Sequence, residues 1–449
     1  MKAIIVGAGE VGVNIAQHLA HEGQDVVIID LDEAKLRHIN ETLDIQTIVG
    51  SGSYPDVLAK AGCDHADMLV AVTDSDEINM VACQMGYSLF DVPMKIARVE
   101  NRSYLSVTHN RIYTPENMPV DMIISPEMEV ADTMLRNMTV PSAFDTYLFG
   151  DDQILLVGLN VGDDASILNV PFRKMQNKLN IPFRAVAIFR GGRLIVPHSS
   201  DHLEQGDELY FICESSKVEE SVARLGVEMK PIRNVFVIGG GGIGYDLCRR
   251  LEQLNISTRV LEYNKERAQF LAENLQKTTV LYGDALDHDL LLQENIGEMD
   301  VVLAVTSNDS TNILASISAG QLGAKSVTTM INGADFLRLS DRLKLETVVS
   351  PRYITASRIV HFTRRGHVMS LHTLHEGEAE VSEVKISNES PLVGMSMADL
   401  KLPDGILVPA IYSEDRGIIL SGDDKIIHAG DRAVIFSTAE QIQAVAKLV

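Results

Sequence analysis

A duplicated glycine motif constrains this chain more than any other feature of its sequence. Gly7–Gly12 (GAGEVG) and Gly239–Gly244 (GGGGIG) each follow a short run of apolar residues. An acidic residue, Asp30 or Glu262, ends the next apolar run, and the two acidic residues are as far apart in the chain as the two motifs. A strand, a glycine-rich turn and a later acidic residue predict a dinucleotide-binding fold. Two such folds in register are far stronger evidence than a single motif.

Each glycine of the motif has its own physical task. The first allows a tight turn, the second lets backbone amides approach a pyrophosphate, and the third lets the helix lie close against the strand. The phosphates then sit at a helix N-terminus, where unpaired N–H groups and the helix dipole favour negative charge. We therefore expect ligand contacts from Gly7, Ala8, Gly9, Glu10, Val11 and Gly12 in the first loop, and from Gly239, Gly241, Gly242, Ile243 and Gly244 in the second.

The acidic residues indicate which nucleotides fit. Asp30 and Glu262 are placed to accept hydrogen bonds from the ribose hydroxyls of an adenine nucleotide. A carboxylate at this position repels a 2'-phosphate. The pattern therefore favours NAD(H) or plain adenine nucleotides over NADP.

The repeat continues through the third and fourth apolar runs. Gly50-Ser51 matches Gly283-Asp284, at a sheet edge where Ser51 or Asp284 would reach the adenine side of a ligand. The run ending in Thr73-Asp74 matches the run ending in Thr306. Each threonine either caps the following helix or contacts the ligand, and the sequence does not decide between these roles.

The alternation of apolar strands and helical segments predicts a doubly wound parallel sheet of the α/β class. After each such lobe, short alternating strands and a Gly-Asp turn indicate a smaller α+β lobe. The whole chain is thus a tandem duplication. We expect nucleotide-binding lobes at residues 1–140 and 232–365, and C-terminal lobes at 141–228 and 366–449.

Composition narrows the partners. The formal net charge of −23 argues against sequence-independent nucleic-acid binding, which needs cationic contacts to phosphates. We expect no signal peptide, because Met1-Lys2 leads directly into a predicted strand, and no apolar stretch approaches the roughly 20 residues of a membrane span. The scattered cysteines have no metal-binding spacing, so we expect buried free thiols and no metal site.

These duplicated motifs resemble the family of regulators of potassium conductance (RCK/KTN), and the resemblance covers essentially the full chain. It implies a cytoplasmic regulatory subunit, peripheral on the inner face of the cell membrane, that binds NAD(H) and ATP or ADP. It also implies a homo-oligomeric ring, expected to be a tetramer, that gates a membrane potassium channel or transporter subunit of the Trk type. The expectation that potassium is the transported ion rests only on this resemblance.

An NAD-dependent dehydrogenase is the alternative reading. Hydride transfer needs a general acid or base and a substrate pocket beside the dinucleotide site. The fourth strand is not followed by a Tyr-x-x-x-Lys pair, and the isolated histidines are typical of solvated surfaces. The sequence therefore favours a binding role without catalytic residues.

The two repeats differ at the end of the fifth apolar run. Pairing Asn101 with Asn332 places Arg98 opposite Thr329. An arginine at this strand end can reach either a ligand phosphate or a neighbouring subunit with its planar fork of donors. The second loop also has Gly242 in place of Glu10, and its glycine run loses more entropy on ordering. We expect the first lobe to bind a nucleotide with a terminal phosphate, and Glu10 to face solvent or a basic partner.

Overall fold

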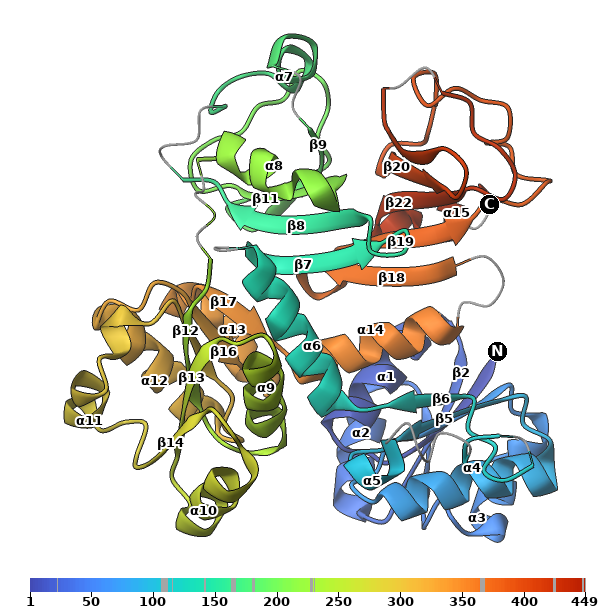
Figure 1. The fold of residues 1–449 in the computed structure, drawn as a ribbon. Helices are drawn as coiled ribbons and strands as arrows, with labels where there is room; N and C mark the ends of the chain where they lie inside the picture. The colour runs from blue at the N-terminus through green and yellow to red at the C-terminus, as the bar shows by residue number, and fades with distance from the viewer. Residues whose placement is uncertain are drawn as a thin grey trace. The chain divides into compact units, whose positions relative to one another are not determined.

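The computed structural model describes residues 1–449 except 22, 106–111, 115, 141–142, 163–166, 180–181, 227–228, 230, 364–367, 423–424, 446–447 and 449. The described residues form two compact units. One comprises residues 1–130 and 350–363, and the other comprises residues 131–349 and 364–449. The elements below are labelled as in Figure 1.

The first parallel sheet lies in the first unit and has the strand order β3-β2-β1-β4-β5-β6. Its core strands are apolar on both faces because helices cover both sides, as expected for a parallel sheet. The elements are β1 (Lys2–Val6), α1 (Glu10–His21), β2 (Asp25–Asp30), α2 (Glu33–Thr42), β3 (Gln46–Val49), α3 (Pro55–Lys60), β4 (Met68–Ala71), α4 (Asp76–Phe90), β5 (Met94–Arg98), α5 (Arg102–Leu105) and β6 (Met122–Ile124).

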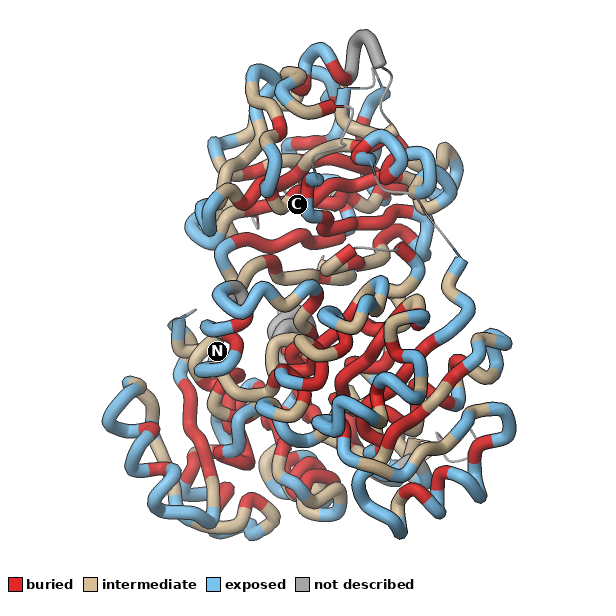
Figure 2. The backbone as a smooth tube through the Cα atoms, turned by 90° about the vertical axis from the view of Figure 1, so that its left-hand side faces the viewer, coloured by how far each residue is buried: buried red, intermediate tan, exposed pale blue. Residues whose placement is uncertain are grey.

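The second parallel sheet repeats this topology in the order β14-β13-β12-β15-β16-β17. Its elements are β12 (Asn234–Ile238), α9 (Gly242–Gln253), β13 (Ser257–Glu262), α10 (Lys265–Asn274), β14 (Thr279–Tyr282), α11 (His288–Gln293), β15 (Val301–Ala304), α12 (Asp309–Gln321), β16 (Val327–Met330), α13 (Ala334–Leu343) and β17 (Thr347–Val349). Buried residues follow the central strands of both parallel sheets in Figure 2. The predicted α/β fold class with doubly wound sheets is confirmed.

The helices that follow the parallel sheets, α6 (Pro126–Thr139) and α14 (Pro351–Thr363), change partners between the repeats. Helix α14 follows the second sheet but packs on α1, and its Ile359 is fully buried in the core of the first lobe. In the second unit, Arg250 of α9 pairs with Asp132 of α6. This exchange explains why the compact units do not coincide with the repeats.

The smaller lobes contain antiparallel sheets of matching order, β10-β9-β11-β8-β7 and β21-β20-β22-β19-β18. The first includes β7 (Ala143–Phe149), β8 (Ile154–Asn160), α7 (Phe172–Leu179), β9 (Phe183–Arg190), β10 (Arg193–Ile195), β11 (Glu208–Glu214) and α8 (Val218–Arg224). The second includes β18 (Val368–Leu374), β19 (Ala379–Lys385), β20 (Ile406–Ser413), β21 (Gly417–Leu420), β22 (Arg432–Thr438) and α15 (Ile442–Val445). Asp207 and Asp431 of the Gly-Asp turns are buried and accept hydrogen bonds from Arg190 and Arg416, so these turns are structural.

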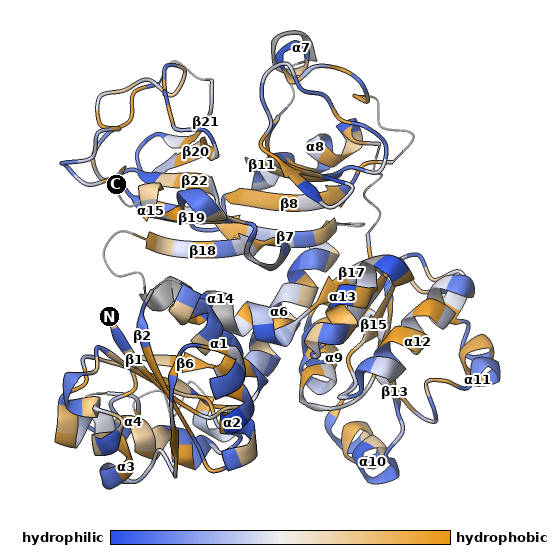
Figure 3. Cartoon of the chain, turned by 180° about the vertical axis from the view of Figure 1, so that it is seen from behind, coloured by the Kyte–Doolittle hydropathy of each residue, from blue (hydrophilic) through white to orange (hydrophobic). Residues whose placement is uncertain are grey.

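The two antiparallel sheets pack face to face. Along β8, Leu155 and Val157 face the core of their own lobe, whereas Ile154 and Leu156 enter a core shared with the other sheet. Side chains alternate between the faces of a strand, so β8 is buried on both sides. Figure 3 shows β8 as a largely hydrophobic strand. The sequence suggested small separate lobes and did not reveal this pairing.

The ends of this shared interface are chemically different. At one end, Arg432 lies over the Tyr412 ring at 4.7 Å and pairs with Asp151 of the other lobe at 2.5 Å. The hydrogen bond from Arg432 lowers the pKa of Asp151. At the other end, His375 stacks on Phe189 and its Nε2 lies 2.5 Å from Glu208 Oε2. An arginine therefore closes one end, and a histidine stacked on a phenylalanine closes the other.

Replacing Arg432 with methionine is expected to destabilise the paired lobes. The change leaves the buried Glu383 carboxylate, 3.3 Å from Arg432 Nη1, without this cation. Breaking a buried ion pair by removing one partner costs about 3 to 5 kcal/mol. Urea unfolding of the full chain, followed by circular dichroism, measures this loss. Glu414→Gln is the control, because Glu414 is an exposed partner of the same arginine. An equal effect of both substitutions would show that burial of Glu383 is unimportant.

Candidate functional site

The first glycine loop contains two closely packed glycines and one glycine with an open side. Gly7 has φ +111° and lies against the backbone of Val72 and Thr73. A Cβ on Gly12 would lie 1.9 Å from the carbonyl oxygen of Gly7, so only glycine lets α1 approach β1 this closely. Among the described residues, no atom lies within 4 Å of a Cβ built on Gly9. Gly9 thus leaves open the space that a pyrophosphate needs.

The second loop has the same geometry. Gly239 has φ +102°, and a Cβ on Gly244 would lie 1.9 Å from the Gly239 carbonyl oxygen. A Cβ on Gly241 would meet no described atom within 4 Å. Gly240 has a separate role, because a Cβ there would lie 2.2 Å from Leu271 Cδ1. Both loops therefore combine two closely packed glycines with one glycine that has an open side.

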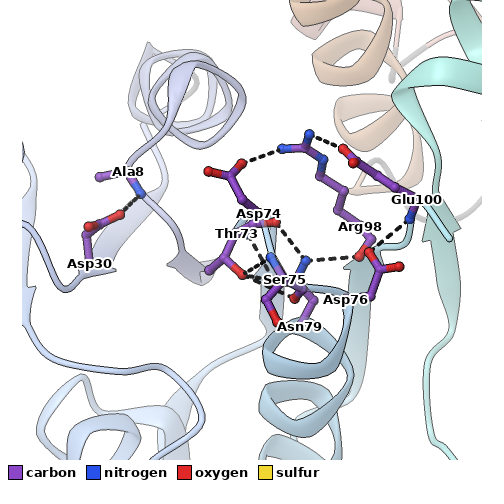
Figure 4. Close-up of polar contacts among 9 residues, drawn as sticks. All are labelled: Ala8, Asp30, Thr73, Asp74, Ser75, Asp76, Asn79, Arg98 and Glu100. Atoms are coloured by element: carbon purple, nitrogen blue, oxygen red, sulfur yellow. Dashed lines mark hydrogen bonds and ion pairs between the residues drawn. The ribbon is translucent and has the colours of Figure 1, made fainter. Parts of the chain in front are cut away.

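Both acidic residues brace their loops. Asp30 Oδ2 accepts a hydrogen bond from the Ala8 N–H at 2.6 Å, as Figure 4 shows, and Oδ1 accepts from the Asp32 N–H at 2.8 Å. Glu262 repeats this with the Gly240 N–H at 2.7 Å and the Asn264 N–H at 2.8 Å. Each carboxylate oxygen has further lone pairs, so the braced group can still accept from a ribose hydroxyl.

The first turns of α1 and α9 complete the loops. Glu10 begins α1 and is exposed, while Val11 is partly buried. Gly242 begins α9, and Ile243 behind it is partly buried. The negative charge of Glu10 lies in the first helical turn, where the helix dipole favours it.

The ends of β3 and β14 lie beside the braced carboxylates. The Gly50 N–H donates to the Asp30 backbone oxygen at 2.9 Å, and the Gly283 N–H donates to the Glu262 backbone oxygen at 3.1 Å. Ser51 Oγ lies 2.8 Å from Ser53 Oγ. Asp284 Oδ1 accepts from the Leu286 N–H at 2.9 Å. The predicted adenine-side residues therefore lie at the predicted edge of each sheet.

Thr73 and Thr306 are held by buried asparagines rather than acting as helix caps. Asn79 Oδ1 accepts from the Thr73 N–H at 2.9 Å and from its hydroxyl at 2.7 Å. The caps are instead Ser75 and Asn308, whose side chains accept from backbone N–H groups of α4 and α12. The capping alternative for the threonines is therefore wrong. Sequence reasoning missed this asparagine bridge, although Asn79 and Asn312 occupy matching positions in both repeats.

Arg98 lies between two carboxylates in the first lobe. Its guanidinium contacts Asp74 at 3.4 Å and pairs with Glu100, as Figure 4 shows. The Asp74 side chain is 99% exposed, so solvent screens its contact with Arg98 and a ligand can displace it. Arg98 Nε is buried without a hydrogen-bond partner in the described residues. The arginine is thus held in place with donor capacity left over.

The structure corrects the sequence alignment of this strand by one residue. Asn79 Nδ2 donates to the Arg98 carbonyl at 2.9 Å, and Asn312 Nδ2 donates to the Met330 carbonyl at 3.0 Å. Arg98 therefore matches Met330, and pairing it with Thr329 was wrong. The expected loss of the arginine in the second lobe still holds, because Met330 is buried and apolar.

The two carboxylates beside Arg98 are also replaced in the second lobe. Asp76 accepts from the Glu100 N–H, and Asp309 accepts from the Asn332 N–H, so Glu100 matches Asn332. The second lobe has Ser307 after Thr306, where the first has Asp74 after Thr73. A charged cluster in the first lobe is therefore replaced by neutral residues in the second.

Other chemical groups offer no alternative centre in the described residues. These residues contain no group of three His, Cys, Asp or Glu side chains arranged to hold a metal ion. The cysteines are buried, and burial raises the pKa of Cys63, Cys213 and Cys248 to about 12. These thiols are therefore protonated at neutral pH and poor nucleophiles. Among the described helices, none is long and apolar enough to cross a membrane.

Solved structures with this architecture include the GsuK RCK domain. It matches with a TM-score of 0.62 and 17% identity, over 100% of this chain and 94% of that one. A structure described as the GsuK channel bound to NAD matches with the same TM-score and identity, over 100% of this chain and 78% of that one. At this identity, the likeness concerns the fold.

Sequence relatives are much closer. The Trk system potassium uptake protein TrkA of Azorhizobium caulinodans is 37% identical, covering 100% of this chain and 98% of that protein. The TrkA proteins of Haemophilus influenzae and Halomonas elongata are 36% and 35% identical, covering 100% and 97% of this chain and 98% and 95% of their own lengths. The TrkA-N domain model matches residues 3–126 and 235–351, and the TrkA-C domain model matches residues 381–449. The duplicated glycine loops, the matching topology and these full-length relatives show that the chain belongs to the TrkA family of Trk system potassium uptake proteins.

Proposed function

We propose that the chain is a nucleotide-binding regulatory subunit that gates a membrane potassium channel or transporter subunit of the Trk type. The observation that carries this proposal is the paired loop geometry, in which Gly9 and Gly241 leave open space beside braced carboxylates. The family relationship supplies potassium uptake. The chain acts as a homo-oligomeric ring, a tetramer, at the cytoplasmic face of the membrane.

The ligands that we propose are NAD(H) and ATP or ADP. The descriptions of two similar structures name NAD and ADP as ligands of GsuK. In this chain, both carboxylates suit unmodified ribose, and the first lobe has Arg98 where the second lobe has Met330. The site comprises the glycine loops, the acidic residues, the ends of β3 and β14, Thr73, Thr306 and Arg98.

Gating requires a ligand whose affinity differs between two conformations. The Asp74–Arg98–Glu100 cluster supplies such a difference. A terminal phosphate would draw Arg98 from Asp74, whereas a ligand without that phosphate leaves the contact intact. ATP and ADP then stabilise different arrangements of the end of β5.

A binding assay separates this role from the dehydrogenase alternative. The purified full chain should bind NADH in calorimetric titration without loss of NADH absorbance in the presence of a panel of small carbonyl substrates. It should also co-purify with its membrane partner from native membranes. Steady NADH oxidation with any of these substrates would support the enzyme instead.

The acidic residues should control ribose binding lobe by lobe. Asp30→Ala removes a charged acceptor, and hydrogen bonds to charged groups contribute about 1.5 to 3 kcal/mol each. NADH affinity of the first lobe should therefore fall about tenfold or more in titration calorimetry. The measurement uses a Glu262→Ala background, which weakens the second site. Unchanged affinity in that background would remove Asp30 from the ligand site.

Arg98 should control the preference between ATP and ADP. Arg98→Met makes this position resemble the second lobe, and loss of a charge-assisted phosphate contact should narrow the ATP to ADP affinity ratio about tenfold. Met330→Leu is the matched control, because it changes the equivalent position while keeping it apolar. Competition titrations of ATP and ADP give the ratio. A ratio that responds to Met330→Leu and not to Arg98→Met would place the discrimination in the second lobe.

A further inference from the structure

The guanidinium of Arg267 lies against the second glycine loop. Arg267 Nε donates to the Gly240 carbonyl at 2.7 Å, and Nη2 donates to the Gly241 carbonyl at 3.1 Å. Its backbone N–H donates to the N-cap Asn264 at 3.0 Å, at the start of α10. A single residue therefore ties α10 to the turn between β12 and α9. This contact was not among the sequence predictions.

Two aromatic rings hold the guanidinium in this position. Arg267 Cζ lies 4.6 Å from the ring centroid of Phe270 and 5.8 Å from that of Tyr245. The two rings pack edge to face, with centroids 5.5 Å apart. Cation–π attraction of this kind favours one placement of an otherwise flexible side chain. The arginine is thus oriented before any ligand arrives.

The guanidinium keeps donors for a ligand. Arginine has five N–H groups, and the two loop carbonyls take two of them. In the described part of the chain, these carbonyls are the hydrogen-bond acceptors of the Arg267 side chain. Three N–H groups therefore remain beside Gly241, the residue whose open side faces the space for a pyrophosphate.

The first lobe lacks this arrangement. Counting from the acidic residue, Lys35 occupies the place of Arg267, and Val13 and His38 occupy the places of Tyr245 and Phe270. Lys35 is exposed, and its ammonium group has no hydrogen bond within the described residues. A lysine without an aromatic seat is a mobile point charge rather than an oriented fork.

Arg267 also reduces the entropic cost of ordering the glycine run. Consecutive glycines lose more conformational entropy on ordering than other residues. The two hydrogen bonds from Arg267 restrict the loop at Gly240 and Gly241, where the first lobe has Ala8 and Gly9. A loop that is already restricted loses less conformational entropy when an anion binds to its amides.

We propose that Arg267 binds the phosphates of an adenine nucleotide in the second lobe, together with the amides at the start of α9. The inference rests on the proposed nucleotide-binding function and assigns the second lobe its own cationic phosphate ligand. The second lobe thereby binds a dinucleotide or a nucleoside diphosphate without an equivalent of Arg98. Arg98 and Arg267 occupy different positions in their lobes, so the lobes recognise phosphates by different routes.

The test measures the second lobe alone. Gly9→Asp blocks the first lobe with a carboxylate that extends into open space and leaves packing intact. In this full-length background, Arg267→Met should weaken NADH and ADP binding about tenfold or more in titration calorimetry. The affinity for adenosine, which has no phosphate, should change less than threefold in competition titrations. Arg267→Lys keeps the charge without the planar fork of donors. Its NADH and ADP affinities should lie between those of the Gly9→Asp background and those of Arg267→Met.

The matched control is Lys35→Met in a Gly241→Asp background, which reports the first lobe alone and should change ADP affinity less than threefold. Circular dichroism checks that each variant is folded. Equal losses for adenosine and ADP would assign Arg267 to loop structure only and overturn the phosphate contact. Wild-type NADH and ADP affinity in the Arg267→Met variant would overturn the inference but leave the proposed function standing. Failure of the Gly9→Asp protein to bind any nucleotide would overturn, for the second lobe, both the Arg267 inference and the proposed nucleotide binding.

Discussion

The contact between the third glycine and the carbonyl of the first sets the geometry of each nucleotide-binding lobe. With 1.9 Å from a built Cβ to the oxygen, even alanine would push the helix away from the strand. The close approach directs the first helical amides toward the carboxyl edge of the sheet. The acidic residue at the end of the second strand then reaches the loop amide and fixes it. Strand, turn, helix and carboxylate therefore form one unit.

The sequence predicted this unit well because its constraints are local and steric. A positive φ at Gly7 and close packing at Gly12 leave glycine as the residue that fits. Both positions can therefore be recognised from the sequence motif alone. The strand order follows from alternating strands and helices. The acidic residues were also found, because their spacing from the loops is fixed by one helix and one strand.

Other features depend on contacts that no spacing encodes. The alignment of Arg98 failed because Asn101 and Asn332 share a residue type, whereas the asparagine bridges to the strand carbonyls define the true match. Arg267 was missed because a helix arginine is usually a solvated surface residue, and only the fold brings it to Gly240. The exchange of α6 and α14 also leaves no local signal, since the partner of each helix lies far away in the sequence.

The two lobes illustrate how duplicated sites diverge at a fixed fold. The first has a charged cluster at the end of β5, whereas the second has neutral residues there. The second instead has an arginine seated on aromatic rings beside its glycine loop. The scaffold contacts are the same in both, down to the threonine and asparagine pair. The two lobes therefore differ in separate residues on a shared scaffold.

The face-to-face packing of the antiparallel sheets has a consequence for assembly. Both sheets belong to one polypeptide, so their association is intramolecular and its effective concentration does not fall on dilution. In a symmetric homodimer, each substitution would alter both ends of such an interface at once. Here a substitution alters one end, which has allowed an arginine pair and a histidine pair to coexist. Any regulated separation of subunits must therefore occur at a surface other than this one.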